Sequence, residues 1–295
     1  PLRFAEFGTG YRWELSGEIS GITRVRGFTH DDAHLFVTED QIANEVLGCI
    51  ELVQVIFDAL GMSDYRVRVG LRDPDSSKYV GDTEKWDRAE EACRAAASSL
   101  GVNWSEEPGE AAFYGPKIDI QFKTALGREE SLATIQLDFA AKERFGLSFM
   151  DETGTENGEV FVIHRAPLST HERFVAFLLE HWKGDLPTWL SPIQVQIITI
   201  SERHKEYARE VSDALKIAGV RVQVDDSDNT IGKKIRTHRK NRPAYMVILG
   251  DDEMGSKSVS IRARSGEQKN GVEMSGFVSD LFAEISNRSI DQTLV

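Results

Sequence analysis

Six side chains suited to binding phosphate, a base or a metal occupy every second position of one short segment. They are Arg24, Arg26, Phe28, His30, Asp32 and His34. If Arg24 to Val37 is a strand, they share one face, because side chains alternate between the two faces of a sheet. Guanidiniums suit phosphate oxygens, a phenyl ring can stack on a base, and carboxylate with imidazole can bind a metal. Each residue alone fits a solvated strand face, but the whole row indicates a binding site.

Two later segments show the same separation of polar and apolar side chains. Lys117, Asp119 and Gln121 alternate with apolar residues, and so do Thr134, Gln136 and Asp138. Neighbouring strands of one sheet would combine these positions into a polar floor, which a substrate pocket requires.

A basic segment lies in the last third of the chain, although the net charge is −13. Its members are Lys233, Lys234, Arg236, Arg239, Lys240 and Arg242. A solvated helix face and a local phosphate-binding surface both explain this run, and the sequence leaves the two open.

The elements that position these residues follow from hydrophobic spacing. Strands are predicted at 3–12, 66–71, 117–122, 134–139 and 159–165, and helices at 42–60, 83–100 and 170–182. Thr38 and Gln41 form a capping box before the first helix. Because strands dominate without a regular βαβ order, we expect an α+β fold with an antiparallel sheet.

The segment from Pro187 to Pro192 interrupts this pattern, so we expect two domains, 1–190 and 191–295. The second domain contains predicted strands at 195–200, 220–224, 245–249 and 258–264. Predicted helices cover 204–218, 231–241 and 273–288. This order predicts a smaller α/β domain with a mostly parallel or mixed sheet.

Composition restricts the class of protein. The two cysteines, Cys49 and Cys93, cannot form a disulfide framework in a chain of 295 residues. No apolar run is long enough to cross a bilayer, and no secretory leader is visible. We therefore expect a soluble cytoplasmic protein with no membrane partner.

Five segments together resemble a known family. GTGYRWE at 8–14, RVRGFTHDDAH at 24–34, EAAFYGPKIDI at 110–120, ATIQLDF at 133–139 and IHRAPLSTHERF at 163–174 are similar, in order and spacing, to the threonyl-tRNA synthetases. Arg12 to Glu14 resembles motif 2 of class II synthetases, and Glu172-Arg173 resembles the end of motif 3. The resemblance implies an antiparallel class II catalytic domain from motif 2 onward, followed by a class IIa anticodon-binding domain.

The resemblance also implies roles for individual residues. ATP, with Mg²⁺, would be bound by Arg12, Glu14, Arg24, Phe28 and Arg173, of which the three arginines would be catalytic. Asp32, Tyr114, Lys117 and Gln136 would bind the amino acid. In the second domain, Glu253 and Arg262 match positions that read anticodon bases.

Zinc is the second cofactor that the resemblance implies, with His34 and His164 as ligands. The third family ligand, a cysteine, is expected before Pro1, and so is motif 1, which builds the homodimer interface of the full-length protein. A zinc ion that binds both the amino group and the hydroxyl of threonine discriminates against valine, which lacks the hydroxyl. The family removes mischarged serine with a separate editing domain, for which no segment is visible here.

This sequence departs from the family pattern at several pocket positions. Ser169 stands where glycine is usual, Leu132 where cysteine is frequent, and His30 where glutamine is common. In the second domain, Asp228 stands where asparagine is common. We expect these changes to alter the pocket lining and the details of base reading.

The leading functional hypothesis is ATP-dependent ligation of L-threonine to tRNA(Thr) through a threonyl-adenylate. The alternative is a synthetase-like regulatory protein that binds nucleotide or tRNA without full catalysis. A relative that charges proline or serine is a third option. Asp32, His34 and His164 argue against it, because a site that selects a hydroxyl through zinc has little purpose for proline.

Overall fold

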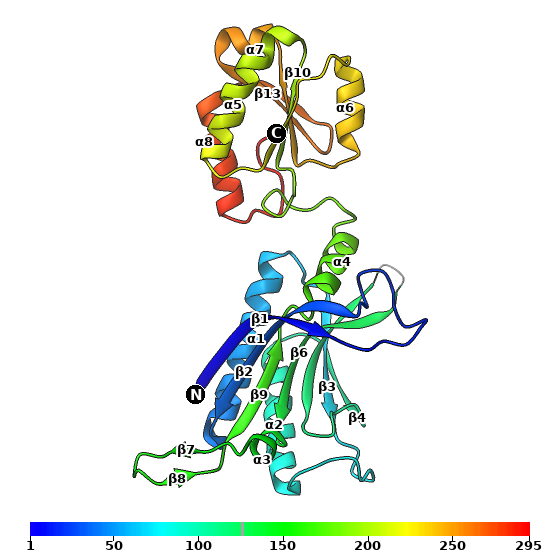
Figure 1. Cartoon of the computed structure of the whole chain (residues 1–295), viewed down its shortest axis with the longest axis vertical. Helices are drawn as coiled ribbons and strands as arrows, with labels where there is room; N and C mark the ends of the chain where they lie inside the picture. Colours follow the sequence, from blue (N-terminus) through cyan, green and yellow to red (C-terminus); the bar gives the residue numbers. More distant parts are fainter. Residues whose placement is uncertain (125–126) are drawn as a thin grey trace. The chain divides into compact units, whose positions relative to one another are not determined.

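The structure is a computed structural model that describes residues 1–124 and 127–295. The chain forms two compact units, Pro1–His181 and Trp182–Val295 (Figure 1). The predicted boundary between residues 190 and 191 lies inside the second unit and stays a prediction. In the described ranges, no helix is both long and apolar enough to cross a membrane.

Unit 1 is built on one large sheet. In order across the sheet, its described strands are β1 (Leu2–Tyr11), β2 (Gly27–Val37), β9 (Phe161–Ala166), β6 (Glu129–Asp138), β5 (Lys117–Lys123), β3 (Tyr65–Leu71) and β4 (Trp104–Pro108). Neighbouring strands run antiparallel except β3 and β4, which are parallel. The predicted antiparallel sheet is therefore present.

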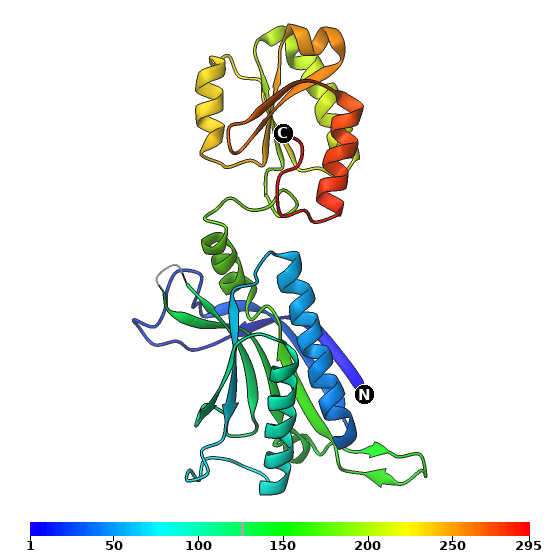
Figure 2. The ribbon, with the colours of Figure 1, turned by 180° about the vertical axis from the view of Figure 1, so that it is seen from behind.

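Two long helices, α1 (Ile42–Ala59) and α2 (Thr83–Ser99), lie side by side over one face of this sheet (Figure 2). The buried positions of α1 are Ile42, Val46, Cys49, Ile50, Val53 and Phe57, the same residues whose spacing predicts the helix. Burial of each large apolar side chain contributes roughly 1.5–3 kcal/mol. Since these helices cover one face, the polar side chains of the strands are left on the other.

Smaller elements complete unit 1. They are η1 (Glu39–Gln41), α3 (Ala141–Phe145), β7 (Phe149–Met150), β8 (Glu156–Asn157) and α4 (His171–His181). The capping box predicted at Thr38 and Gln41 is present at the start of η1. The prediction of one strand from Arg24 to Val37 is wrong at its beginning, because β2 starts at Gly27 and Arg24 lies in the preceding loop, bridged to Ser20.

Unit 2 has a mixed sheet with helices on both sides, α5 and α8 on one and α6 on the other (Figure 1). The strand order is β11 (Val222–Asp225), β10 (Val195–Thr199), β12 (Tyr245–Leu249), β13 (Ser258–Ala263) and β14 (Gln268–Glu273). β10 runs parallel to β11 and β12, whereas β13 is antiparallel to both of its neighbours.

The helical elements of unit 2 are η2 (Glu202–His204), α5 (Lys205–Ile217), α6 (Ile231–Arg239), α7 (Asp251–Ser256) and α8 (Met274–Ser286). The core contains Tyr207, Val211 and Leu215 from α5 and Phe277 and Leu281 from α8, packed against the buried strands. The smaller α/β domain with a mixed sheet is therefore present as predicted.

Candidate active site

A cavity of about 700 Å³ in unit 1 is lined by all five residues that the resemblance assigns to ATP. These residues are Arg12, Glu14, Arg24, Phe28 and Arg173. The first three lie in the connection that leaves β1 and returns to β2, Phe28 lies at the start of β2, and Arg173 lies in the first turn of α4. The structure thus brings together side chains that are far apart in the sequence.

Carboxylates hold two of the cavity arginines. Arg24 Nη2 lies 2.9 Å from Glu14 Oε2, and Arg173 Nη2 donates a hydrogen bond of 2.5 Å to Glu130 Oε2. The contact with Arg24 lowers the pKa of Glu14 below its usual value and raises that of Arg24. Both guanidiniums are therefore held in direction by a carboxylate before any phosphate arrives. Glu130 was not singled out from the sequence, because it lies outside the alternating polar positions.

Arg12 lies over the ring of Phe28, with its guanidinium carbon 5.5 Å from the ring centroid. A cation at this distance is attracted to the ring face. Gly10, on the adjacent strand β1, leaves the space that the ring occupies, because a Cβ there would lie 2.6 Å from Phe28 Cε2. The phenyl face assigned to the base is therefore supported by backbone on one side.

Ser169 also lines this cavity, and its backbone explains why glycine suits the position. Its φ is 52°, in the left-handed region that residues with a Cβ avoid at a cost of roughly 1–2 kcal/mol. The Ser169 carbonyl accepts a hydrogen bond of 3.3 Å from the Asp31 amide, which ties this loop to β2. Leu132, by contrast, is fully buried.

A second group of predicted residues forms one row across four strands. His34 on β2 pairs with His164 on β9, His164 with Gln136 on β6, and Gln136 with Lys117 on β5. Directly opposed residues on one face have Cβ atoms about 5 Å apart. The Tyr114 hydroxyl joins this row by donating a hydrogen bond of 3.2 Å to Gln136 Oε1.

Gly115 allows the loop that carries Tyr114 to approach the sheet. A Cβ at this position would lie 1.9 Å from the backbone carbonyl oxygen of Leu137. The Leu137 amide also donates a hydrogen bond of 3.1 Å to the Pro116 carbonyl, and the Phe139 amide one of 2.8 Å to the Tyr114 carbonyl. Only glycine fits this contact without a shift of the backbone.

Asp119 supports the row, and the sequence analysis placed it in the polar floor without assigning it a role of its own. Its carboxylate is 2% exposed, lies 3.0 Å from Lys117 Nζ and 2.8 Å from Arg68 Nη2, and accepts a hydrogen bond of 2.8 Å from Thr134 Oγ1. The available signal was its place on the same strand face as Lys117. A buried charge requires such partners, so Asp119 fixes the position of the Lys117 ammonium.

Asp32 lies among histidines at the end of the row. Its Oδ1 is 2.5 Å from His164 Nε2, and its Oδ2 is 3.8 Å from His30 Nδ1. Burial alone would raise the pKa of Asp32, but the two histidines outweigh burial and hold it well below its usual value. His34 packs on His164 with near-parallel rings, their centroids 4.7 Å apart.

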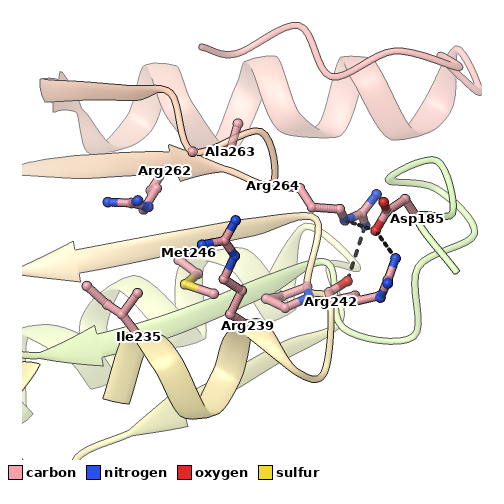
Figure 3. Close-up of a pocket in the computed structure, with 10 residues that line it drawn as sticks. Asp185, Ile235, Arg239, Arg242, Met246, Arg262, Ala263 and Arg264 are labelled. Atoms are coloured by element: carbon pink, nitrogen blue, oxygen red, sulfur yellow. Dashed lines mark hydrogen bonds and ion pairs between the residues drawn. The ribbon is translucent and has the colours of Figure 1, made fainter. Parts of the chain in front are cut away.

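In unit 2, Arg262 lines a cavity of about 210 Å³ with three other arginines, Arg239, Arg242 and Arg264 (Figure 3). Arg242 Nη1 lies 2.8 Å from Asp185 Oδ1, and Arg264 Nε lies 3.6 Å from the same atom. Within residues 1–124 and 127–295, no carboxylate is in ion-pair contact with Arg239 or Arg262. These two guanidiniums can therefore bind an anion without first breaking an ion pair with a carboxylate.

Glu253 lines a different cavity, so the structure does not bring it together with Arg262. Its Oε2 accepts a hydrogen bond of 2.9 Å from the Gly250 amide, and its Oε1 accepts one of 2.6 Å from Ser260. Lys234, in the basic segment, is 1% exposed and donates a hydrogen bond of 2.8 Å to the Thr199 carbonyl. That residue is structural, and neither interpretation of the basic run applies to it.

Comparison with known proteins identifies both domains. Residues 1–182 match the tRNA synthetase class II core domain (G, H, P, S and T), and residues 194–284 match an anticodon binding domain. The chain is 47% identical over 290 residues to the threonine–tRNA ligase of Rubrobacter xylanophilus, covering 98% of this chain and 45% of that protein. It therefore spans about half the length of the curated relatives that it matches.

Solved structures of aminoacyl-tRNA synthetases are similar to this chain in fold. The crystal structure titled as the RNA binding domain of threonyl-tRNA synthetase from Cryptosporidium parvum has a TM-score of 0.87 and 37% identity, and the match covers 100% of this chain and 72% of that one. Prolyl-tRNA synthetase from the same organism, at 22% identity and a TM-score of 0.66, covers 98% of this chain and 57% of that one and shares the fold.

The fold and the cavity define the core of a class II aminoacyl-tRNA synthetase with an anticodon-binding domain, as predicted. Within that class, the chain belongs to the threonyl-tRNA synthetase family.

Proposed function

We propose that this protein ligates L-threonine to tRNA(Thr) through a threonyl-adenylate. One observation carries the proposal. The cavity lined by the five ATP residues adjoins the polar row, because His30 lines that cavity and also groups with Asp32 and His164. A nucleotide and a small polar amino acid would thus meet on one face of the sheet.

In the first step, a carboxylate oxygen of threonine attacks the α-phosphorus of ATP, and pyrophosphate leaves with the electrons of the broken P–O bond. Arg12 neutralises the two anions that must approach each other, and Arg24 and Arg173 bind the outer phosphates together with Mg²⁺. Glu14 holds Arg24 in its direction. No general base is needed, because the nucleophile is already ionised and the contribution of the protein is positioning and charge.

In the second step, a ribose hydroxyl at the end of the tRNA attacks the carbonyl carbon of the adenylate. AMP leaves with the electrons of the broken C–O bond, and the hydroxyl proton passes to the phosphate of AMP or to water. Tyr114, Lys117 and Gln136 hold the amino acid during both steps. Lys117 is positioned for this by Asp119, 3.0 Å away.

Zinc is part of the proposal, with the ligands His34 and His164 taken from the family resemblance. The local chemistry fits a divalent ion, because Asp32 Oδ1 and His164 Nε2 are buried polar atoms without a hydrogen-bond partner. The two atoms lie 2.5 Å apart. Bound zinc would supply a Lewis acid for the amino group and hydroxyl of threonine.

For tRNA, we propose that unit 2 binds the anticodon, with Arg262 and its neighbouring arginines providing the positive surface. Guanidiniums bind both phosphates and base edges in an unpaired loop. Glu253 would take part only after releasing its contacts with Gly250 and Ser260. We place the reaction in the cytoplasm and expect a homodimer, following the family.

The test is threonine-dependent exchange of pyrophosphate into ATP by the protein purified with Zn²⁺ and Mg²⁺. We expect exchange with threonine and much less with valine, because valine cannot replace the hydroxyl ligand. Binding of ATP without exchange under any amino acid would contradict ligation. That result would favour the alternative, a regulatory protein that binds nucleotide.

A further inference from the structure

Ser169 has a left-handed backbone conformation without the usual structural reason for one. Five described residues other than glycine have a positive φ, and four of them follow the end of a helix within three residues: Lys183, Arg242, Lys257 and Arg288. A left-handed residue is a common way for a helix to end. Ser169 instead lies two residues before the start of α4, with a φ of 52°. Strain of this kind beside a cavity indicates a functional constraint.

The backbone polar groups of Ser169 have partners, whereas its hydroxyl has none. The Ser169 amide donates a hydrogen bond of 3.4 Å to the Ala166 carbonyl, and the Ser169 carbonyl accepts one of 3.3 Å from the Asp31 amide. In the part of the chain that the structure describes, the hydroxyl makes no hydrogen bond. The residue is half-buried and lines the cavity of about 700 Å³. A group that can both donate and accept is therefore available to a ligand in that cavity.

The position of Ser169 beside β2 indicates which part of a nucleotide it would meet. A β-bridge between Thr170 and His30 brings the loop that carries Ser169 against the middle of this strand. Phe28, assigned to the base, and Asp32, assigned to the amino acid, lie two residues to either side of that bridge, roughly 13 Å apart. In ATP, the ribose lies between the base and the α-phosphate that threonine attacks. The ribose would therefore lie beside Ser169.

We propose that Ser169 is a specificity-determining residue for ATP, and that its hydroxyl forms a hydrogen bond with a ribose hydroxyl of the nucleotide. The inference rests on the proposed function only in placing ATP in this cavity. Both hydroxyls can donate and accept, so the contact needs no charge and no change of protonation. Glycine at this position would relieve the backbone strain but would lack the contact. The serine therefore lowers the stability of unit 1 and provides recognition of the ribose.

The experiment combines the variant Ser169→Ala with nucleotides that lack one ribose hydroxyl. Ser169→Ala keeps the Cβ, and with it the backbone strain, and removes only the hydroxyl. Binding of ATP, 2′-deoxyATP and 3′-deoxyATP to the chain of 295 residues is measured by isothermal titration calorimetry. We expect the variant to bind ATP roughly threefold to tenfold more weakly than the unchanged chain. For the deoxynucleotide that lacks the contacted hydroxyl, the two proteins should agree within about twofold, because the contact is already absent.

Ser77→Ala is the matched control, because Ser77 is exposed and does not line the cavity. It should change the binding of none of the three nucleotides. Ser169→Gly is a second variant, in which the strain is removed together with the hydroxyl. It should lose the same discrimination between ATP and the deoxynucleotide, while the Tm of unit 1 rises by about 2–4 °C.

An equal loss of affinity for ATP and for both deoxynucleotides in Ser169→Ala would overturn the proposal, and so would unchanged affinity for ATP. If Ser169→Ala does not fold, Ser169→Gly decides, and full discrimination in that variant would contradict the contact. Pyrophosphate exchange is measured separately. The ribose contact without exchange would sink the proposed function and leave this inference standing, whereas failure of the unchanged chain to bind ATP would overturn both.

Discussion

The polar row in unit 1 and the arginine cavity in unit 2 are assembled in different ways. In the row, neighbouring strands carry one polar side chain each at the same register, and a buried carboxylate holds Lys117. In the arginine cavity, the four guanidiniums come from α6, the connection after it, β13 and the turn that follows, and Arg239 and Arg262 are free of described carboxylates. The side chains of the row are held by their own contacts, whereas Arg239 and Arg262 in the arginine cavity have no described carboxylate partner.

If this contrast is right, the largest effect should follow from disturbing the packing of the row. Gly115→Ala places a Cβ 1.9 Å from the Leu137 carbonyl oxygen, and the backbone must move. We expect the free energy of unfolding of unit 1 to fall by about 3 kcal/mol, measured by urea denaturation. Gly48→Ala is the control, because nothing lies within 4 Å of its added Cβ in α1, and it should stabilise by up to about 1 kcal/mol. Equal stability of the two variants would argue against a tightly packed site.

A smaller effect is expected from Asp119→Asn, which removes the charge that holds Lys117 and Arg68. Loss of a hydrogen-bonded charge contact should lower the stability of unit 1 by about 2 kcal/mol and raise the KM for threonine in pyrophosphate exchange. Asp58→Asn, on the exposed side of α1, should change neither quantity. An unchanged KM would mean that Asp119 supports the fold and not the ligand.

The smallest effect should come from the open cavity. Arg262→Ala removes one guanidinium that makes no ion pair among the described residues, so stability should not change. Affinity for tRNA should fall by on the order of 1 kcal/mol, with exchange of pyrophosphate unaltered, as measured by filter binding and exchange assays. Arg209→Ala, on the exposed surface of α5, is the control. Loss of exchange in Arg262→Ala would contradict the separation between the two regions.

Sequence periodicity was sufficient for the elements that pack a core. The buried positions of α1 and the polar face of β5 and β6 follow from spacing alone, because apolar burial imposes that spacing. Periodicity was insufficient where polar side chains are positioned by ion pairs and hydrogen bonds with one another. Arg24 lies in a loop and reaches the cavity through its contact with Glu14, which no alternation predicts. The exposed strand β14, with its sequence QKNGVE, carries no apolar pattern and was missed.

The polar residues of β2 show a similar limit. His30, Asp32 and His34 occupy alternate positions of one strand, so spacing places all three on the same face. Spacing does not give the contacts of these side chains, which follow from side-chain torsions and from the stacking of His34 on His164, a residue of β9. In the same way, Lys234 falls in a run of solvated cations, but the α6 position packs it against the ends of β10 and β11.

The row of His34, His164, Gln136 and Lys117 has a thermodynamic consequence. Its strands β2, β9, β6 and β5 are all interior to the sheet, with β1, β3 and β4 outside them. Backbone amides in such strands exchange with solvent mainly when the whole unit unfolds. The backbone that carries the row therefore has little conformational entropy left to lose if a ligand binds to these side chains, because that backbone is already ordered by folding.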